Sequence, residues 1–148
     1  MIKENGRDCR VCVRSEQRGA DGEKQIMETK SEGRLSEREG VLYVLYTENM
    51  EETGSGTPAV VKNLLKIDRK TARVELKKSG AVSWKMCFEA GLRGRSEYGT
   101  PYGALEISAE TKAVTVKKEQ EKISLQLLYT LFIQGEKQAD CRLEIEIR

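Results

Sequence analysis

The residues best suited to chemistry are two cysteines near the start of the sequence. Cys9 and Cys12 form a C-x-x-C pair, the spacing of redox-active dithiols and of half a zinc site. The flanking residues alternate as in a strand, which places the two thiols on opposite faces. The remaining cysteines, Cys87 and Cys141, are isolated, and the chain has no histidine. We therefore expect no metal site and no cofactor, and in the cytoplasm, where we expect this chain, all four thiols should be reduced.

A second group combines arginine with aromatic residues. Arg93 and Arg95 precede Tyr98, while Trp84 and Tyr102 lie close by in the sequence. Arginine supplies forked donors for an anion, and aromatic rings supply stacking and apolar area. One interpretation is a binding site for a small anionic or apolar ligand, made by Trp84, Arg93, Arg95, Tyr98 and Tyr102. The other places both arginines on a solvated outer face and the rings in the core.

The absence of histidine excludes the commonest catalytic arrangements. Ser-His and Cys-His pairs, an imidazole base and histidine-bound zinc are all ruled out. Glutamate, tyrosine, lysine and cysteine remain as acid–base groups, but no spacing marks a pair of them. The glycine-rich segment 54–57 lacks the Lys-Ser/Thr of a P-loop. No catalytic residue is predicted, and an enzyme is the least favoured class of function.

The charge balance names no partner. The 148 residues carry 26 Lys and Arg against 24 Asp and Glu, a net charge of +2, although 34% of the residues are charged. The five basic residues before position 20 alternate with acidic ones, unlike the one-sided patch of a nucleic-acid binder. No stretch approaches the ~20 apolar residues of a membrane span, and no signal-peptide pattern follows the N-terminus. We expect a cytoplasmic protein that binds neither nucleic acid nor membrane; its oligomeric state is left open.

Alternation of apolar and charged residues dominates the chain and predicts half-buried strands. It is clearest at 72–77, 82–89 and 141–148, and weaker at 9–18, 25–34, 60–68, 105–109 and 113–118. Segments 41–47 and 123–133 are apolar on both faces. Residues 23–38 have helix-forming composition but no apolar face of helical period, so a strand is expected there. Eight to ten short strands in one domain, 1–148, favour a single antiparallel β-barrel over a sandwich, because a closed sheet removes edges.

Turn residues separate these strands. Glycines at positions 22, 40, 80 and 135 supply the positive φ that hairpins need. Thr100–Gly103 suits a type I turn with proline at its second position, and 51–57 has the composition of a mobile loop.

One stretch of the sequence resembles a known family. Phe88-Glu89-Ala90-Gly91 followed by Tyr98-Gly99-Thr100-Pro101-Tyr102-Gly103-Ala104-Leu105-Glu106-Ile107 resembles the uncharacterised YwiB-like family of small bacterial proteins. The steps Asp21-Gly22-Glu23 and Glu32-Gly33 and the closing segment 143–147 fit the same layout, so the likeness covers nearly the whole chain. The resemblance implies a calycin, that is, a lipocalin-like antiparallel barrel. It implies no catalytic residues and leaves the function open.

Two function classes follow from a barrel. The first is a binding module that holds one small ligand in its interior or mouth. Against it stands the size of the inward residues Trp84, Met86, Phe88 and Leu143, which are large enough to fill the barrel. The second is a protein-interaction or regulatory module that uses the outer face and loops such as 51–57. Whether the interior is filled or open decides between them.

Overall fold

Ten antiparallel strands make up the computed structural model, which describes residues 6–50, 59–80, 83–100 and 103–148. No described residue lies in a helix, so none forms a helix able to cross a membrane. The predicted all-β antiparallel barrel is confirmed. The strands are β1 (Arg7–Gly19), β2 (Lys24–Arg38), β3 (Val41–Met50), β4 (Ala59–Asp68), β5 (Arg73–Gly80), β6 (Trp84–Phe88), β7 (Arg93–Thr100), β8 (Gly103–Glu119), β9 (Lys122–Ile133) and β10 (Glu136–Ile147).

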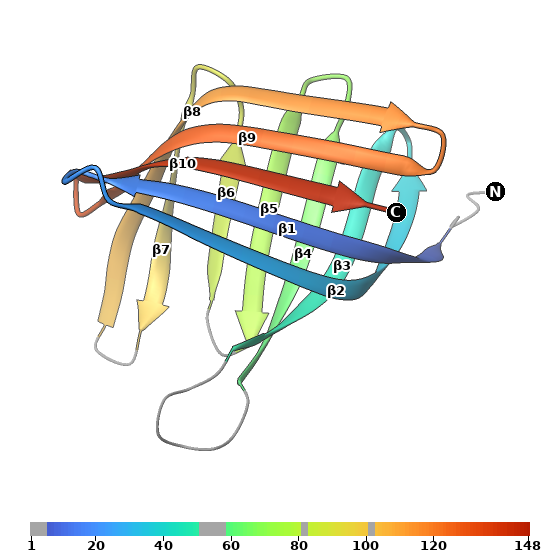
Figure 1. Ribbon diagram of the computed structural model, residues 1–148, viewed down its shortest axis with the longest axis horizontal. Helices are drawn as coiled ribbons and strands as arrows, with labels where there is room; N and C mark the ends of the chain where they lie inside the picture. The colour runs from blue at the N-terminus through green and yellow to red at the C-terminus, as the bar shows by residue number, and fades with distance from the viewer. Residues whose placement is uncertain (1–5, 51–58, 81–82, 101–102) are drawn as a thin grey trace.

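The strands follow one another around a single sheet. Their order is β6-β5-β4-β3-β2-β1-β10-β9-β8-β7, so the first and last strands of the chain pair with each other, with Val11 opposite Ile147. The sheet curls until β6 and β7, which are consecutive in sequence, come together (Figure 1). The barrel therefore closes in the middle of the chain.

Two long strands belong to both walls of the barrel. β2 pairs with β1 along most of its length and then with β3 from Gly33 onward. β8 pairs with β7 and then runs along β9, with a bulge between Thr111 and Ala113. As a result β8, β9, β10, β1 and β2 cross steeply in front of the other strands (Figure 1). Residues 24–38 form a strand, as the sequence predicts.

The glycine at the end of the β1-paired part of β2 is required by a close approach. A Cβ atom on Gly33 would lie 2.6 Å from the backbone oxygen of Leu45, a distance that no side chain tolerates. Glycine at this position lets β2 pass close over β3 where it turns from one wall into the other.

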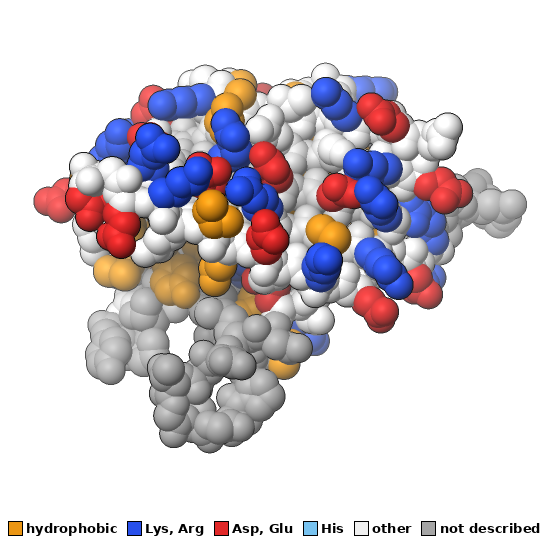
Figure 2. Space-filling model, viewed as in Figure 1, with side chains coloured by type: hydrophobic (Ala, Val, Ile, Leu, Met, Phe, Trp, Pro, Cys, Tyr) orange, Lys and Arg blue, Asp and Glu red, His pale blue; other side chains and the backbone are white. Residues whose placement is uncertain are grey.

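The alternation predicted from the sequence produces a continuous apolar core. Met86, Phe88 and Leu143 are all buried, so these large inward residues do fill part of the interior. The Phe88 and Tyr129 rings meet at a centroid distance of 4.9 Å. Most charged residues occupy the outside, where Lys and Arg mix with Asp and Glu over the front strands (Figure 2).

The two ends of the barrel differ. At the end where β2 finishes, Glu37 accepts from Arg69 at 3.0 Å and contacts Lys118 at 3.5 Å, which ties β2 to the β4–β5 turn and to β8. We call the opposite end, where β3, β5 and β7 finish and β4, β6 and β8 begin, the lower end, as it is drawn in Figure 1.

The seam between β6 and β7 closes the barrel with few hydrogen bonds. Ser83 and Gly99 form an isolated bridge, and the Lys85 backbone N–H donates to Ser96 Oγ at 3.3 Å. A Cβ atom on Gly94 would lie 2.6 Å from the Cys87 backbone oxygen and 3.0 Å from Met86 Sδ. Glycine at this position therefore lets the two strands approach, and the sheet becomes a nearly closed barrel.

The hairpin turns agree with the glycine positions. Glu39-Gly40 and Gln134-Gly135 have positive φ at both residues, 52° and 81° in the first and 52° and 79° in the second, as a two-residue type I′ turn requires. The predicted loop at 51–57 lies outside the described residues, as do the two central residues of the turn predicted at 100–103.

Candidate functional site

The residues that the sequence proposes for a ligand site lie on two faces of the barrel. Trp84 and Tyr98 face inward and pack partly against the core. The Ser83–Gly99 bridge places them opposite each other across the seam. Arg93 and Arg95 alternate with these inward residues and are exposed on the outside. Tyr102 lies outside the described residues.

Arg93 has partners on the outer face. Its Nη2 lies 3.2 Å from Glu110 Oε2, and its guanidinium carbon lies 4.1 Å from the centroid of the Phe132 ring. It therefore covers an outward aromatic ring by a cation–π contact. The structure does not bring the arginines and the inward rings together, and this matches the alternative in which the arginines form a solvated face.

A single row of inward side chains crosses six strands at the lower end. Tyr46 of β3 is opposite Asn63 of β4, Asn63 is opposite Lys78 of β5, and Lys78 is opposite Trp84 of β6. The row continues through Tyr98 to its partner on β8, Leu105. We call these six residues the inner row: Tyr46, Asn63, Lys78, Trp84, Tyr98 and Leu105.

Burial and polarity change along the inner row from β3 to β8. Tyr46 and Asn63 are buried, Trp84 and Tyr98 are half-buried, and Leu105 is 37% exposed. The polar part thus lies deep, and the aromatic and aliphatic part lies toward solvent. Hydrophobic side chains gather in the recess below the front strands (Figure 2), in keeping with an apolar lower end.

An ion pair lies over the polar part of the row. Lys78 Nζ donates to Glu48 Oε1 at 2.8 Å, and each side chain is 24% exposed. Glu48 is on β3 and Lys78 is on β5, so the pair must cross the inner face of the intervening β4. Glu48 is opposite Val61, and Lys78 is opposite Asn63. The pair therefore covers these two β4 residues from the lower end.

Asn63 is the most unusual member of the row. Its side chain is 0% exposed, and neither Oδ1 nor Nδ2 has a hydrogen-bond partner among the described residues. Trp84 Nε1, in the same row, is also buried and has no partner in the described part of the chain. An unsatisfied buried polar group costs about 1–3 kcal/mol. Three buried hydrogen-bonding atoms of this one row therefore lack a partner among the described residues, at a cost in folding free energy.

Burial also fixes the protonation state of the neighbouring phenol. Burial raises the pKa of Tyr46, and the negative charge of Glu48 adds to the rise. Tyr46 therefore stays a neutral phenol at any physiological pH. The ionised groups of the inner site are then Glu48 and Lys78, which neutralise each other.

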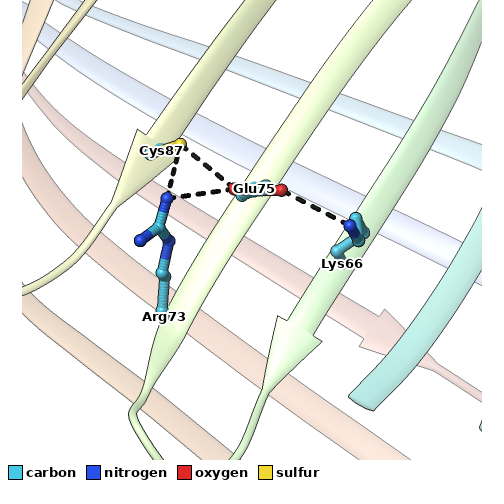
Figure 3. Close-up of polar contacts among 4 residues, drawn as sticks. All are labelled: Lys66, Arg73, Glu75 and Cys87. Atoms are coloured by element: carbon cyan, nitrogen blue, oxygen red, sulfur yellow. Dashed lines mark hydrogen bonds and ion pairs between the residues drawn. The ribbon is translucent and has the colours of Figure 1, made fainter. Parts of the chain in front are cut away.

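A separate cluster of polar side chains lies on the outer face of β4, β5 and β6 (Figure 3). Cys87 Sγ donates to Glu75 Oε1 at 3.5 Å, and Arg73 Nη2 lies 3.1 Å from the same oxygen and 3.6 Å from the sulfur. Lys66 Nζ lies 3.7 Å from Glu75 Oε2 and 5.5 Å from the centroid of the Tyr43 ring. Both basic side chains pair with the one carboxylate, so every charged group of the cluster has a partner, and the cluster is a stabilising network rather than a vacant site.

Glu75 is the carboxylate at the centre of this cluster. Burial acts to raise its pKa, but the hydrogen bond from Cys87 and the charges of Lys66, Lys85 and Arg73 outweigh burial, and the pKa is lowered. The carboxylate is therefore ionised throughout the physiological range.

The front strands carry a shallow groove of about 520 Å³ on the outer wall. Its charges are of both signs, with three basic and three acidic side chains, and Arg14 Nε lies 3.2 Å from Glu28 Oε1. The groove therefore favours no charge class of ligand. Its charged lining residues are Arg14, Glu28, Lys30, Lys117, Glu144 and Glu146.

The C-x-x-C pair behaves as the strand pattern predicts. Cys9 is buried, Cys12 is half-buried three positions along β1 on the other face, and all four cysteines are free thiols. Among the described residues no group of histidine, cysteine or acidic side chains is arranged to hold a metal ion.

The sequence pattern indicated Trp84 and Tyr98 of the inner row as candidate site residues, but it did not indicate Tyr46, Asn63 or Lys78. The available signal was the segment Val61-Lys62-Asn63-Leu64-Leu65-Lys66-Ile67. Its inward positions hold Val61, Asn63, Leu65 and Ile67. Asparagine is the one polar residue among them, and burying a polar side chain is unfavourable. The ion pair over it had no sequence signal, because Glu48 and Lys78 are 30 residues apart.

Three comparisons with known proteins all relate this chain to a family of β-barrel proteins of unknown function. The family described as "Domain of unknown function (DUF1934)" matches residues 11–145. The chain is 25% identical over 118 residues to "Uncharacterized beta-barrel protein YwiB" of Bacillus subtilis (strain 168), covering 80% of this chain and 78% of that protein. The crystal structure of ywiB protein from Bacillus subtilis superposes with a TM-score of 0.77 at 20% identity, covering 97% of this chain and 92% of the other. At that identity the structural likeness concerns the fold.

Proposed function

The chain belongs to the DUF1934 family, as its resemblance to YwiB-like proteins implies, and from this barrel fold we propose that it binds one small ligand at the inner row. The ligand's polar end lies toward Asn63 and its apolar body lies against Trp84, Tyr98 and Leu105. The role is one of binding without chemical conversion.

The observation that carries this proposal is the side chain of Asn63, which is buried and has no hydrogen-bond partner among the described residues. A leucine or valine there would continue the apolar alternation of β4 at no polar cost. An amide that is fully desolvated and unfilled is stabilised when a bound molecule supplies its partners. Ligand sites in barrels have this composition, with an apolar lining and a few convergent polar groups.

The distribution of packing supports a site at one end of the barrel. Met86 and Phe88 fill the middle beside the row, and Glu37 with its partners ties the far end together. Asn63 is buried, Lys78, Trp84 and Tyr98 are half-buried, and Leu105 at the end of the row is exposed. The ligand would therefore enter from the side of β7 and β8 and lie across the row.

The chain contains one tryptophan, and it lies in the proposed site, so intrinsic fluorescence reports on that site directly. We expect a fragment collection to contain molecules that shift Trp84 emission, saturate at one per chain and raise the melting temperature. A matched control is Arg95→Ala, which removes an exposed outer side chain and should leave binding unchanged. The proposal is rejected if saturating ligands bind without changing Trp84 emission, or if no molecule produces all three effects.

An interaction module is a second candidate, favoured by one observation on β2. Residues 24–32 pair with β1, and β3 begins to pair only at Gly33, so within the described residues this part has one unpaired edge. Ile26 and Met27 on it are exposed. An extended segment of another chain adds to such an edge as a strand. A purified partner that loses affinity for Met27→Lys would support this role, and equal affinity would exclude it.

A further inference from the structure

We infer that the buried group of the ligand is an uncharged amide-type group, such as a carboxamide, a lactam or an imide. This inference rests on the proposed function and adds the chemical class that the inner row recognises. Three features of the row lead to it: the cancelled charge, the identity of the unfilled hydrogen-bonding atoms, and the apolar rings beside them.

The charge of the site argues against an ionised ligand group. Among the described inward positions of β3–β8 at the lower end, Glu48 and Lys78 are the charged residues, and they are paired at 2.8 Å. Tyr46 is held neutral by its raised pKa. A carboxylate or ammonium placed in this row would lose its hydration without gaining an unpaired counter-ion, which is unfavourable.

The unfilled atoms match the hydrogen-bonding pattern of one amide. Asn63 offers an acceptor, Oδ1, and a donor, Nδ2, while Trp84 offers a donor, Nε1. An amide carbonyl oxygen has two lone pairs, so it accepts from Asn63 and Trp84 together. The adjacent N–H of the ligand donates to Asn63 Oδ1. One planar group thus fills all three atoms. An ester or an ether lacks the donor, and an alcohol carries its donor and acceptors on a single oxygen, which cannot align with both atoms of the Asn63 amide as an adjacent C=O and N–H do.

The neighbouring side chains suit a flat apolar body attached to that amide. Trp84 and Tyr98 lie opposite each other across the seam, and Leu105 is opposite Tyr98 on the next strand. Aromatic rings stack on planar ligands and bury large apolar areas. The expected ligand is therefore a neutral aromatic or cyclic amide whose body extends from Trp84 toward Leu105.

Four matched probes test the class. Benzamide carries the full pattern, N,N-dimethylbenzamide lacks the N–H, benzoate adds a charge, and toluene lacks the polar group. Binding is followed by two-dimensional ¹H–¹⁵N NMR, in which the one indole N–H of Trp84 gives an isolated resonance. We expect benzamide to shift this resonance and the resonances of the Asn63 side-chain amide. The other three probes should bind at least about tenfold more weakly than benzamide.

Two variants identify the recognising atoms. Asn63→Leu keeps the branched side-chain shape and should weaken benzamide about tenfold while leaving toluene unchanged. Asn63→Val serves the same purpose if leucine proves too large for the fold. Thr111→Val is the matched control, because Thr111 Oγ1 is also buried without a described partner but lies outside the inner row. It should not alter benzamide affinity.

The outcomes separate this inference from the function on which it rests. Benzoate binding as tightly as benzamide, or benzamide binding unaffected by Asn63→Leu, overturns the amide class while a Trp84 response leaves ligand binding in place. If no fragment of any class perturbs the Trp84 resonance, and Asn63 shows a long-lived bound water by NMR, the unfilled atoms serve a structural water. That result overturns both proposals.

Discussion

Lys78 and Glu48 lie on strands that are not neighbours, yet Lys78 Nζ donates to Glu48 Oε1 at 2.8 Å across the inner face of β4. Inward charges in a small barrel are expensive unless they are paired. Their pairing shields the β4 residues beneath and leaves the inner row without net charge. The ion pair is thus the electrostatic basis of the site.

Removing one partner of this pair should destabilise the fold more than removing both. Lys78→Met leaves Glu48 as an uncompensated, partly buried carboxylate, and we expect a loss of about 1–3 kcal/mol in the free energy of unfolding. The double change Glu48→Gln with Lys78→Met removes both charges and should lie within about 1 kcal/mol of the wild type. Urea denaturation of the wild type, of Glu48→Gln and Lys78→Met singly, and of the double variant measures this, and additive losses would contradict a coupled pair.

Replacing Asn63 should stabilise the unliganded protein. Asn63→Leu removes two buried polar atoms that have no described partner, so we expect the free energy of unfolding to rise by about 1–2 kcal/mol. The melting temperature without ligand is the readout. A clear loss of stability, reproduced by Asn63→Val, would mean that the amide has a structural partner in the folded protein.

The stability of the seam between β6 and β7 should depend on Gly94 and not on Gly99, the other glycine of β7. A Cβ atom on Gly94 would meet the Cys87 backbone oxygen at 2.6 Å, whereas one on Gly99 would meet nothing within 4 Å. We expect Gly94→Ala to cost about 1–3 kcal/mol, the range for overpacking. Gly99→Ala should change stability by less than about 0.5 kcal/mol. Equal effects in thermal melts would show that β7 shifts freely along the seam.

The Glu75 cluster should contribute stability that acid removes. The pKa of Glu75 is lowered from its ordinary value of 4.5, so its stabilisation is present above about pH 4.5 and is lost as the pH falls through the folded-state pKa. Glu75→Gln should cost about 0.5–1 kcal/mol at pH 7. The difference from the wild type should shrink in denaturation curves taken at progressively lower pH. A difference that is constant with pH would contradict the charge-based account.

Thiol reactivity should divide the four cysteines into two classes. Burial raises the pKa of Cys141 to about 11 and also raises that of Cys9, while Cys12 and Cys87 are half-buried on the outer face. The thiolate is the reactive form. We expect an aromatic disulfide reagent at pH 8 to modify Cys12 and Cys87 rapidly, and the other two after denaturant is added. Peptide mapping assigns the sites, and rapid modification of Cys141 would refute its burial.

The strands were predictable because period-two alternation depends on local residue type alone. The Glu39-Gly40 and Gln134-Gly135 turns were equally local, since positive φ favours glycine. The barrel also followed, because many one-sided strands must close around their apolar faces. What local patterns cannot give is register. The pairing of Asn63 with Lys78, and of Trp84 with Tyr98, depends on how ten strands align around the ring.

The arginine–aromatic group illustrates this limit. Arg93, Arg95 and Tyr98 are close in sequence, but alternation sends the arginines outward and Tyr98 inward. The true neighbours of Trp84 in the inner row come from β5 and β7. Proximity along a strand therefore suggests residues that share a site only when they are two positions apart.

The order of strands around the barrel also determines how much chain entropy is lost when each pair of strands forms. Every pair in the sheet except β1–β10 joins strands that are consecutive in the chain, so most contacts close short loops and form early at low cost. One step remains that unites the two ends, where Arg10 and Arg148 exchange backbone hydrogen bonds of 2.8 and 3.0 Å. We therefore expect the pairing of the chain's first and last strands to be the slow step of folding.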